Sequence, residues 1–432
     1  MTPQRWPVRL SPALIALAAS PRLTSALTTA AIGVAATTFL TRRLIGWPGL
    51  VAILVTLGLL MAASFLARRR EVAWRGVLPI SLLSFLGWAV LSLLWSEYQW
   101  ATLGGLAYLG AFTLLALYIA LSRDTIQIVR ATGDVLRVVL AASLILEVFS
   151  GILIDAPIRF LAIEGRIAEL GPITGIASTR NQLGLLAIIG AVTFVVEWRT
   201  RSVTPLVGAL STAGALLTLG FTASPIIYGA AAVVLLATVG VYLIRRVRPE
   251  RRPAWQLSVL GVGAVLAVVA WLSRSWIVEL LYASGEINYR LTIWRQVSAL
   301  SNVNPLEGWG WIGRWDRELA PFVAITTSTA RDPLSASNAF VDVWFQLGLV
   351  GLALFAGLVG LAVARSWLLA GRRRSVVYAW PATVLVALIV LSVAESTILV
   401  DFGWMIFVVC CMKASQELSW RTALRSAPAA QP

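Results

Sequence analysis

The sequence predicts an all-α, polytopic integral membrane protein with about twelve transmembrane helices. Its 432 residues are 59% hydrophobic and 13% charged, with a mean hydropathy of +0.83, whereas soluble domains are about half apolar and about a quarter charged. Apolar runs of about 20 residues, long enough to cross a bilayer core of about 30 Å, recur from end to end. Because these runs do not alternate with a period of two, they indicate helices and not a barrel. We expect one transmembrane domain over residues 1–432.

Short basic segments separate the apolar runs and indicate how the spans are oriented across the membrane. The expected spans lie near 23–41, 44–67, 76–95, 101–122, 134–154, 181–198, 203–222, 224–244, 255–273, 338–364, 376–395 and 397–412. Arginine clusters at 68–70, 199–201, 245–252 and 372–374 fall on one side, with the basic residues of both termini. Short cytoplasmic loops are enriched in arginine, so we expect that side and both termini to be cytoplasmic. Arg42 and Arg43 fall on the opposite side, so the first pair of spans agrees least well with this topology.

The composition also argues against several classes of function. The net charge of +15 comes from clusters at the ends of apolar runs, which indicates membrane topology and not nucleic-acid binding. Histidine is absent, which removes the commonest general base and the commonest metal ligand. We expect no metal site and no cofactor. Cys410 and Cys411 are adjacent in an apolar run and are expected to pack as small apolar side chains.

Two longer loops, 155–179 and 274–337, are expected outside the membrane. Both carry arginines together with acids, which suits either a solvated surface or a site for an anionic lipid head group, since long loops are largely exempt from the arginine bias. Arg180 and Asn181 open the span after the first loop. An arginine there can snorkel to the interface, or it can bind phosphate with help from the helix N-terminus.

The second loop contains a predicted amphipathic helix at 286–300, lying on the outer membrane face. Its apolar positions recur at three- and four-residue spacing: Ile287, Leu291, Trp294 and Val297. Arg290 shares a face with Trp294, so Arg290 is the arginine expected to point into a common site, and Trp294 is a substrate-binding candidate. Arg295 points elsewhere and is kept as a substrate-binding candidate.

Beyond this helix, Gly308 and Gly310 allow a tight turn or a close backbone approach. Trp309 and Trp311 are either interfacial tryptophans or surfaces on which sugar rings stack. We include all four among the substrate-binding candidates, together with Asn181.

Polar residues mark the outer end of the span at 338–364. Ser337 and Asn338 form its lip, and Asp342 lies one turn below Asn338. Acids at membrane depth are functional candidates, here Glu147, Asp342, Glu395 and Asp401. Ser337, Asn338 and Asp342 are candidate catalytic residues at this outward-facing lip. The alternative is a capped helix whose Asp342 pairs with a loop arginine.

The order of three stretches resembles the bacterial O-antigen ligase/polymerase family over roughly residues 140–412. The first is Arg180-Asn181 with Gly184 opening a span. The second, RLTIWRQVSALSNVNPLEGWGW, is similar to the family's R-x3-W-x4-A-L run followed by P-L-x-G-x-G. The third, SNAFVDVWFQLGLVG, is similar to H-N-x-(Y/F)-x5-E-x-G-x2-G. The sequence departs from the family where Ser337 replaces histidine, Gln346 replaces the acid, and Pro225 replaces an arginine.

The resemblance implies a glycosyltransferase in the bacterial cytoplasmic (inner) membrane. Its donor would be a glycan on undecaprenyl pyrophosphate, its acceptor the hydroxyl of a glycan or lipid, and its site would face outward among membrane lipids. Arg180 and Arg290 would stabilise the leaving diphosphate. Serine of ordinary pKa is no base at neutral pH, so Ser337 is expected to bind substrate or cap the helix, and Asp342 is the candidate base.

The missing histidine favours a polymerase of surface polysaccharide repeat units slightly over a ligase. A flippase or other transporter and a non-catalytic scaffold remain the competing classes.

Overall fold

The computed structural model describes residues 12–68, 79–273, 284–329, 333–373 and 375–417. Over these ranges the chain is helical and contains no strand, only an isolated bridge between Ile158 and Ile163. Several features discussed above lie outside the described residues: both termini, Arg69-Arg70, Arg374 and the 274–283 part of the long loop.

The chain is an all-helical membrane protein, as expected. Six segments are long and apolar enough to cross a bilayer: Thr38–Ala67, Gln99–Ser122, Thr125–Ile154, Arg180–Arg199, Pro225–Arg246 and Ala339–Arg372. Shorter apolar helices cover Ile80–Leu94, Pro205–Phe221 and Val376–Ser392. The count of about twelve spans stays a prediction.

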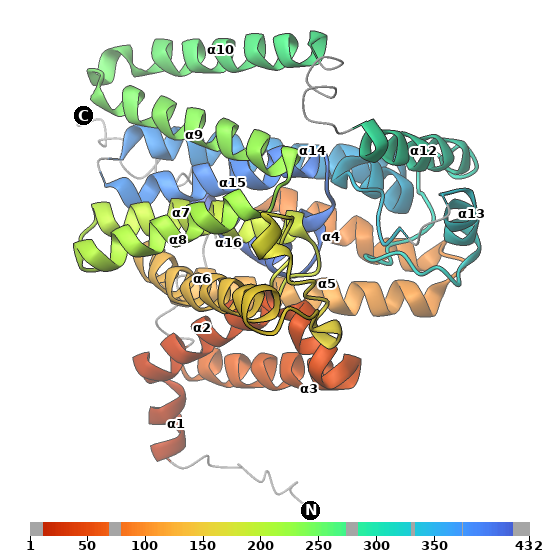
Figure 1. Ribbon diagram of the computed structural model, residues 1–432, viewed down its shortest axis with the longest axis horizontal. Coiled ribbons are helices and arrows are strands. Elements are labelled where there is room, and N and C mark those ends of the chain that lie inside the picture. The colour runs from red at the N-terminus through yellow and green to blue at the C-terminus, as the bar shows by residue number, and fades with distance from the viewer. Residues whose placement is uncertain (1–11, 69–78, 274–283, 330–332, 374, 418–432) are drawn as a thin grey trace, which may run out of the picture.

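Figure 1 shows the long helices packed together, with α12 and α13 gathered at one end. The helices are α1 (Pro12–Ala18), α2 (Pro21–Ala36), α3 (Thr38–Ala67), α4 (Ile80–Leu91), α5 (Gln99–Ser122), α6 (Thr125–Val148), α7 (Arg180–Arg199), α8 (Pro205–Phe221), α9 (Pro225–Arg246), α10 (Arg252–Leu272), α12 (Ser284–Ser301), α13 (Ala320–Thr329), α14 (Ala339–Arg372), α15 (Ala379–Ser392) and α16 (Asp401–Glu417). The stretch expected to be helical at 286–300 lies in α12.

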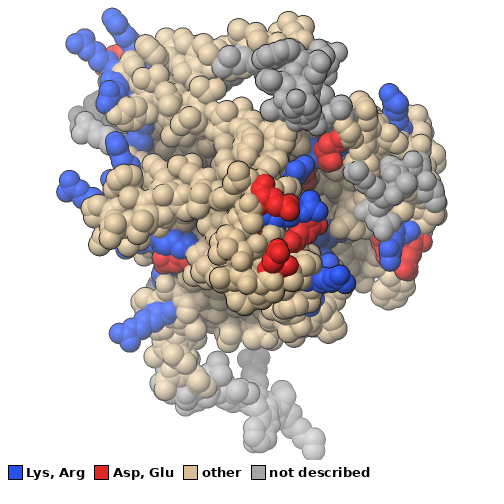
Figure 2. All heavy atoms as spheres, viewed as in Figure 1, with Lys and Arg blue, Asp and Glu red and all other residues tan. Residues whose placement is uncertain are grey.

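Basic side chains collect where several helices end. The last turns of α7, α9 and α14 carry arginines, and Figure 2 shows many basic side chains along the edge where these helices end in Figure 1. At the ends of α3 and α5, Arg68 donates to Thr24 Oγ1 (3.1 Å) and Arg123 donates to Ser25 Oγ (3.0 Å). The start of α2 therefore lies beside the ends of α3 and α5.

Glycines in the left-handed region break two helices. Gly46 (φ 71°) divides α3, so the boundary that we expected at Arg42–Arg43 was misplaced by a few residues. Arginine is compatible with a helix, whereas the conformation at the break is one that glycine adopts at low cost. Arg42 and Arg43 consequently lie in the first part of α3, before the break.

Gly348 (φ 66°) divides α14 in the same way, and the segment 302–319 packs against the break. Gly310 N donates to Gln346 O (2.8 Å) and Leu349 N donates to Pro305 O (2.9 Å). A Cβ on Gly308 would lie 2.5 Å from Gly348 N, and one on Gly348 would lie 2.1 Å from Leu306 O. Both glycines permit this close contact, which fixes the loop over the start of α14.

Candidate functional site

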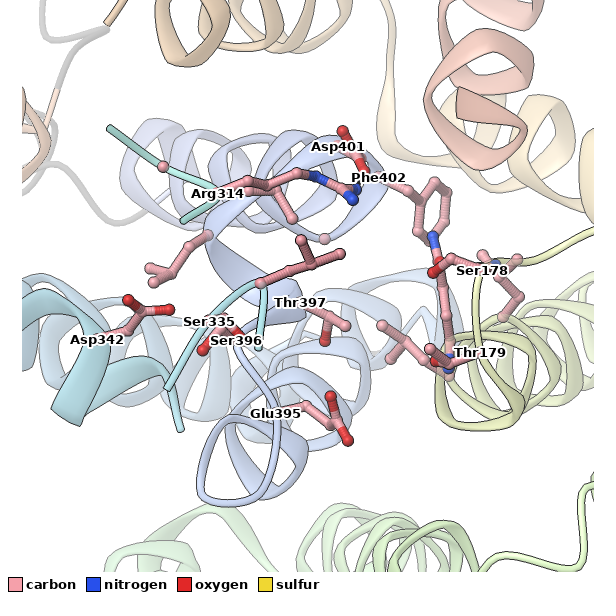
Figure 3. Close-up of a pocket in the computed structure, with 18 residues that line it drawn as sticks. Ser178, Thr179, Arg314, Ser335, Asp342, Glu395, Ser396, Thr397, Asp401 and Phe402 are labelled. Carbon is pink, nitrogen blue, oxygen red and sulfur yellow. Dashed lines mark hydrogen bonds and ion pairs between the residues drawn. The ribbon is translucent and has the colours of Figure 1, made fainter. Parts of the chain in front are cut away.

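A cavity of about 130 Å³ lies where the start of α7, the start of α14 and the segment 393–403 meet. Its polar lining residues are Ser178, Thr179, Gln182, Arg314, Ser335, Asp342, Glu395, Ser396, Thr397 and Asp401. Figure 3 shows that Asp342, Glu395 and the Arg314–Asp401 pair approach the cavity from different sides. Asp342 is thus brought to a common cavity with acids more than fifty residues away in the sequence.

Asn338 fixes the start of α14 next to this cavity. Its side-chain oxygen accepts hydrogen bonds from Phe340 N (2.9 Å) and Val341 N (3.2 Å), and its amide donates to Val393 O (3.0 Å). The first two bonds satisfy free amides at the helix N-terminus. The third ties α14 to the segment after α15, so Asn338 positions Asp342 relative to Glu395.

Asp342 is 1% exposed and is held at one oxygen only. Its Oδ1 accepts hydrogen bonds from Trp315 Nε1 (2.7 Å) and Gln346 Nε2 (2.9 Å). Its Oδ2 is buried without a hydrogen-bond partner among the described residues. The alternative in which a loop arginine pairs with Asp342 is not what the structure shows. The carboxyl group is oriented, and its second oxygen, which has the Ser396 hydroxyl and the Ala336 backbone nearby, makes no hydrogen bond of normal length among the described residues.

Gln346, at the family's acidic position, connects the loop to the helix. Its Oε1 accepts from Ile312 N (2.9 Å) and Gly313 N (2.8 Å), while Nε2 donates to Asp342 and to Gly313 O (3.1 Å). An amide provides both donors and acceptors for this arrangement. An ionised carboxylate could only accept, so it could not donate to Asp342.

Arg290 does not line the cavity itself but lies in a buried network behind Glu395, which does. Its side chain is 7% exposed, and Nη2 contacts Glu395 Oε1 (3.0 Å) and Glu286 Oε1 (3.3 Å). Nη1 donates to Ala394 O. Asn181 also donates to Glu395 and accepts from Ser224 Oγ (2.7 Å). The network joins α7, α9 and α12 to the segment after α15.

Arg180 lies beside this network and not in the cavity lining. Thr179 caps α7 by accepting from Gln182 N (3.1 Å), and Arg180 Nη1 donates to Ala223 O (3.3 Å). The side chain is partly exposed. The neighbouring Asn181 links this turn to Glu395, and hence to Arg290.

Arg314 is a site residue that sequence reasoning missed. It lines the cavity and forms an ion pair with Asp401, which also accepts a hydrogen bond from Tyr108 OH. The carboxylate of Asp401 raises the pKa of Arg314 above its usual value, so the guanidinium stays charged. Asp401 was recognisable as an acid at membrane depth, but no sequence spacing links it to Arg314, 87 residues away.

The remaining expected residues are not among those that line the cavity. Trp294 donates to Ala336 O (2.9 Å). Trp311 is 1% exposed and packs edge-on against Phe85, with ring centroids 6.0 Å apart. Trp309 is partly buried, Arg295 is exposed, and Ser337 has a positive φ of 50°. Trp311 is therefore part of the hydrophobic core in this structure.

Among the described residues, no group of three or more His, Cys, Asp or Glu side chains is placed to hold a metal ion.

Part of the chain matches a known protein family. Residues 210–356 match the family model described as O-antigen ligase. The matched stretch begins in α8, contains Arg290, Arg314 and Asp342, and ends in α14 beyond the break at Gly348. No curated protein matches the chain. The match supports the O-antigen ligase/polymerase family, and Arg180 and the segment 393–403 lie outside it.

Proposed function

We propose that this chain, whose match over residues 210–356 supports the O-antigen ligase/polymerase family, transfers a glycan from undecaprenyl pyrophosphate to an acceptor hydroxyl. The family supports membrane glycan transfer in general. We further propose that the reaction takes place at the outer face of the cytoplasmic membrane. One observation carries it: Asp342, whose Oδ2 has no hydrogen-bond partner among the described residues, lines a cavity whose walls also hold arginine-paired acids.

The donor diphosphate is assigned to Arg180 and Arg290. Both lie next to the start of α7, and the network through Asn181 and Glu395 connects them. Arginine presents several donors in a plane that match phosphate oxygens. The Nε of Arg290 is buried and has no partner among the described residues, which leaves a donor for the ligand. Charge developing on the leaving diphosphate is stabilised by these preorganised groups.

Asp342 is the proposed base. The acceptor oxygen attacks the anomeric carbon of the donor sugar, the bond from that carbon to the diphosphate oxygen breaks, and the hydroxyl proton passes to Asp342 Oδ2. Undecaprenyl diphosphate leaves with the bonding electrons. Trp315 and Gln346 hold the other carboxyl oxygen and so orient the base.

Polymerisation of repeat units is preferred slightly over ligation because the family's histidine is Ser337 here. A relay for transport has less support, since the acids have separate partners. Glu147 accepts from Thr174 N (3.1 Å) and Gly175 N (2.9 Å), which fixes the loop 155–179, and Asp401 pairs with Arg314.

The test is transfer by the purified protein in liposomes that contain an undecaprenyl-pyrophosphate oligosaccharide, with products resolved by size. A ladder of multiples identifies a polymerase. A single addition to a supplied acceptor identifies a ligase. Arg180→Ala is expected to lose most of either activity, because one contact to the leaving diphosphate is removed. Absence of product across a panel of donors and acceptors contradicts glycan transfer.

A further inference from the structure

The arginines on the two sides of the cavity, Arg290 on one and Arg314 on the other, differ in how many carboxylates neutralise them. Arg290 contacts two carboxylates, those of Glu286 and Glu395. On the other side, Arg314 forms an ion pair with Asp401, and Arg42 is close enough for its charge to interact with both of them. Two guanidinium groups therefore lie near one carboxylate, which leaves this side with excess positive charge.

Arg42 is held in place by aromatic rings. Its guanidinium lies 4.9 Å from the centre of the Trp47 ring, which is an attractive arrangement for a cation. Trp47 packs edge-on against Tyr108, with centroids 5.9 Å apart, and Tyr108 donates to Asp401. No described residue accepts a hydrogen bond from the Arg42 guanidinium.

Arg314 supplies an independent observation. Its Nε is buried and has no hydrogen-bond partner among the described residues, although Nη2 binds Asp401. A buried polar group without a partner is costly. An anionic oxygen approaching between Arg42 and Arg314 would satisfy this donor and neutralise the excess charge.

We propose that Arg42 and Arg314 bind the phosphate or diphosphate head group of a membrane lipid, at a site separate from Arg180 and Arg290. The planar donors of arginine match phosphate oxygens. The neighbouring surface of α3 suits the lipid tail, because its large apolar side chains are about half exposed: Leu44 (58%), Ile45 (51%), Val51 (50%) and Val55 (54%). The lipid is either bulk anionic phospholipid or a polyprenyl diphosphate.

A polyprenyl diphosphate here would give the cavity two lipid-linked substrates, one beside the Arg314–Asp401 pair and one beside the Arg290–Glu395 pair. This consequence rests on the proposed function, since it assigns the second lipid as the acceptor. The binding site itself does not depend on transfer, because head-group binding requires only the two arginines.

The test is lipid binding to the purified chain in phosphatidylcholine nanodiscs, measured by native mass spectrometry during titration with undecaprenyl diphosphate. We expect two bound molecules for the unaltered protein. Arg42→Gln should weaken one of them by roughly tenfold or more, as expected for loss of a charge-assisted contact. Arg43→Gln is the matched control, because Arg43 is the next residue, is exposed and stacks on Phe39 (5.3 Å). Thermal unfolding of both variants checks that they fold equally well.

Competition with phosphatidylglycerol identifies the lipid. If phosphatidylglycerol displaces the Arg42-dependent molecule, the site binds bulk anionic lipid; if it does not, the site selects the polyprenyl diphosphate. Equal binding by Arg42→Gln, Arg43→Gln and the unaltered protein overturns the proposal. Arg42-dependent binding without any glycan transfer would contradict the proposed function alone, and transfer without Arg42-dependent binding would contradict the lipid site alone.

Discussion

At the scale of single residues, Glu395 is the acid that connects Arg290 to the start of α7 beside the cavity. It accepts from Asn181 and pairs with Arg290, whose side chain is 7% exposed. The sequence marked Glu395 only as an acid at membrane depth. Its partners could not be inferred, because they lie 214 and 105 residues away and belong to other helices. Asn338 and Asp342 were easier to predict, since helix capping and one-turn spacing are local patterns.

The Glu395–Arg290 pair should contribute to stability. Glu395→Gln leaves Arg290 buried with less compensation, so we expect a loss of about 3–5 kcal/mol in the free energy of unfolding. Thermal unfolding in detergent measures it. Glu286→Gln is the control, because Glu286 is 40% exposed and an exposed pair is worth about 0–1 kcal/mol. Equal effects of the two substitutions would contradict this role for Glu395.

The geometry of the Arg290 guanidinium is tested by Arg290→Lys. Lysine keeps the charge but lacks the planar donors that contact Ala394 O and Glu395 together. We expect the rate of glycan transfer to fall at least about tenfold, whereas Arg199→Lys, an exposed arginine in the last turn of α7, should keep it. Full activity of Arg290→Lys would argue against a bidentate role.

At the scale of elements, the broken helix α14 and the segment 302–319 form one unit. Periodicity predicted α12, and the glycines at 308 and 310 suggested a close backbone approach. Their partners could not be inferred from the sequence, because Gly308 approaches Gly348 in α14, whereas Gly310 approaches Ser96, which precedes α5. Gln346 likewise joins the loop to Asp342 by contacts that only the folded chain brings together.

Gly348→Ala should disrupt this unit. The added Cβ would lie 2.1 Å from Leu306 O at a φ of 66°, so we expect a loss of at least about 1–3 kcal/mol in stability from backbone strain alone. Gly357→Ala is matched to it, because that glycine is in the same helix and a Cβ there meets nothing within 4 Å. Thermal unfolding compares the two. Equal stability would show that the break does not require glycine.

At the scale of the whole molecule, the two ends of the helix bundle differ in charge. One end carries arginines in the last turns of α7, α9 and α14. The cavity lies at the starts of α7 and α14, where arginines meet acids. Arg42 and Arg43 conflicted with the arginine bias in the sequence. Arg42 lies at the cavity end, where its charge interacts with those of Arg314 and Asp401, a relation that the sequence did not show.

This difference in charge predicts which end is cytoplasmic. In intact cells, a membrane-impermeant maleimide should label Leu170→Cys, which is 75% exposed in the loop 155–179. It should label Arg248→Cys, exposed between α9 and α10, only after permeabilisation. Background labelling should be low, because Cys410 and Cys411 are 0% and 3% exposed. The reverse pattern would place the cavity on the cytoplasmic side.

The central claim is that Asp342 accepts the proton of the acceptor hydroxyl, and the most direct measurement is the transfer rate of Asp342→Asn in reconstituted liposomes. Asparagine keeps the size of the side chain and removes the basic oxygen, so we expect the rate to fall by about 10²-fold or more. Asp316→Asn, an exposed change in the segment that covers the same cavity, should leave the rate unchanged. A folded Asp342→Asn protein that transfers glycan at the unaltered rate would contradict the account.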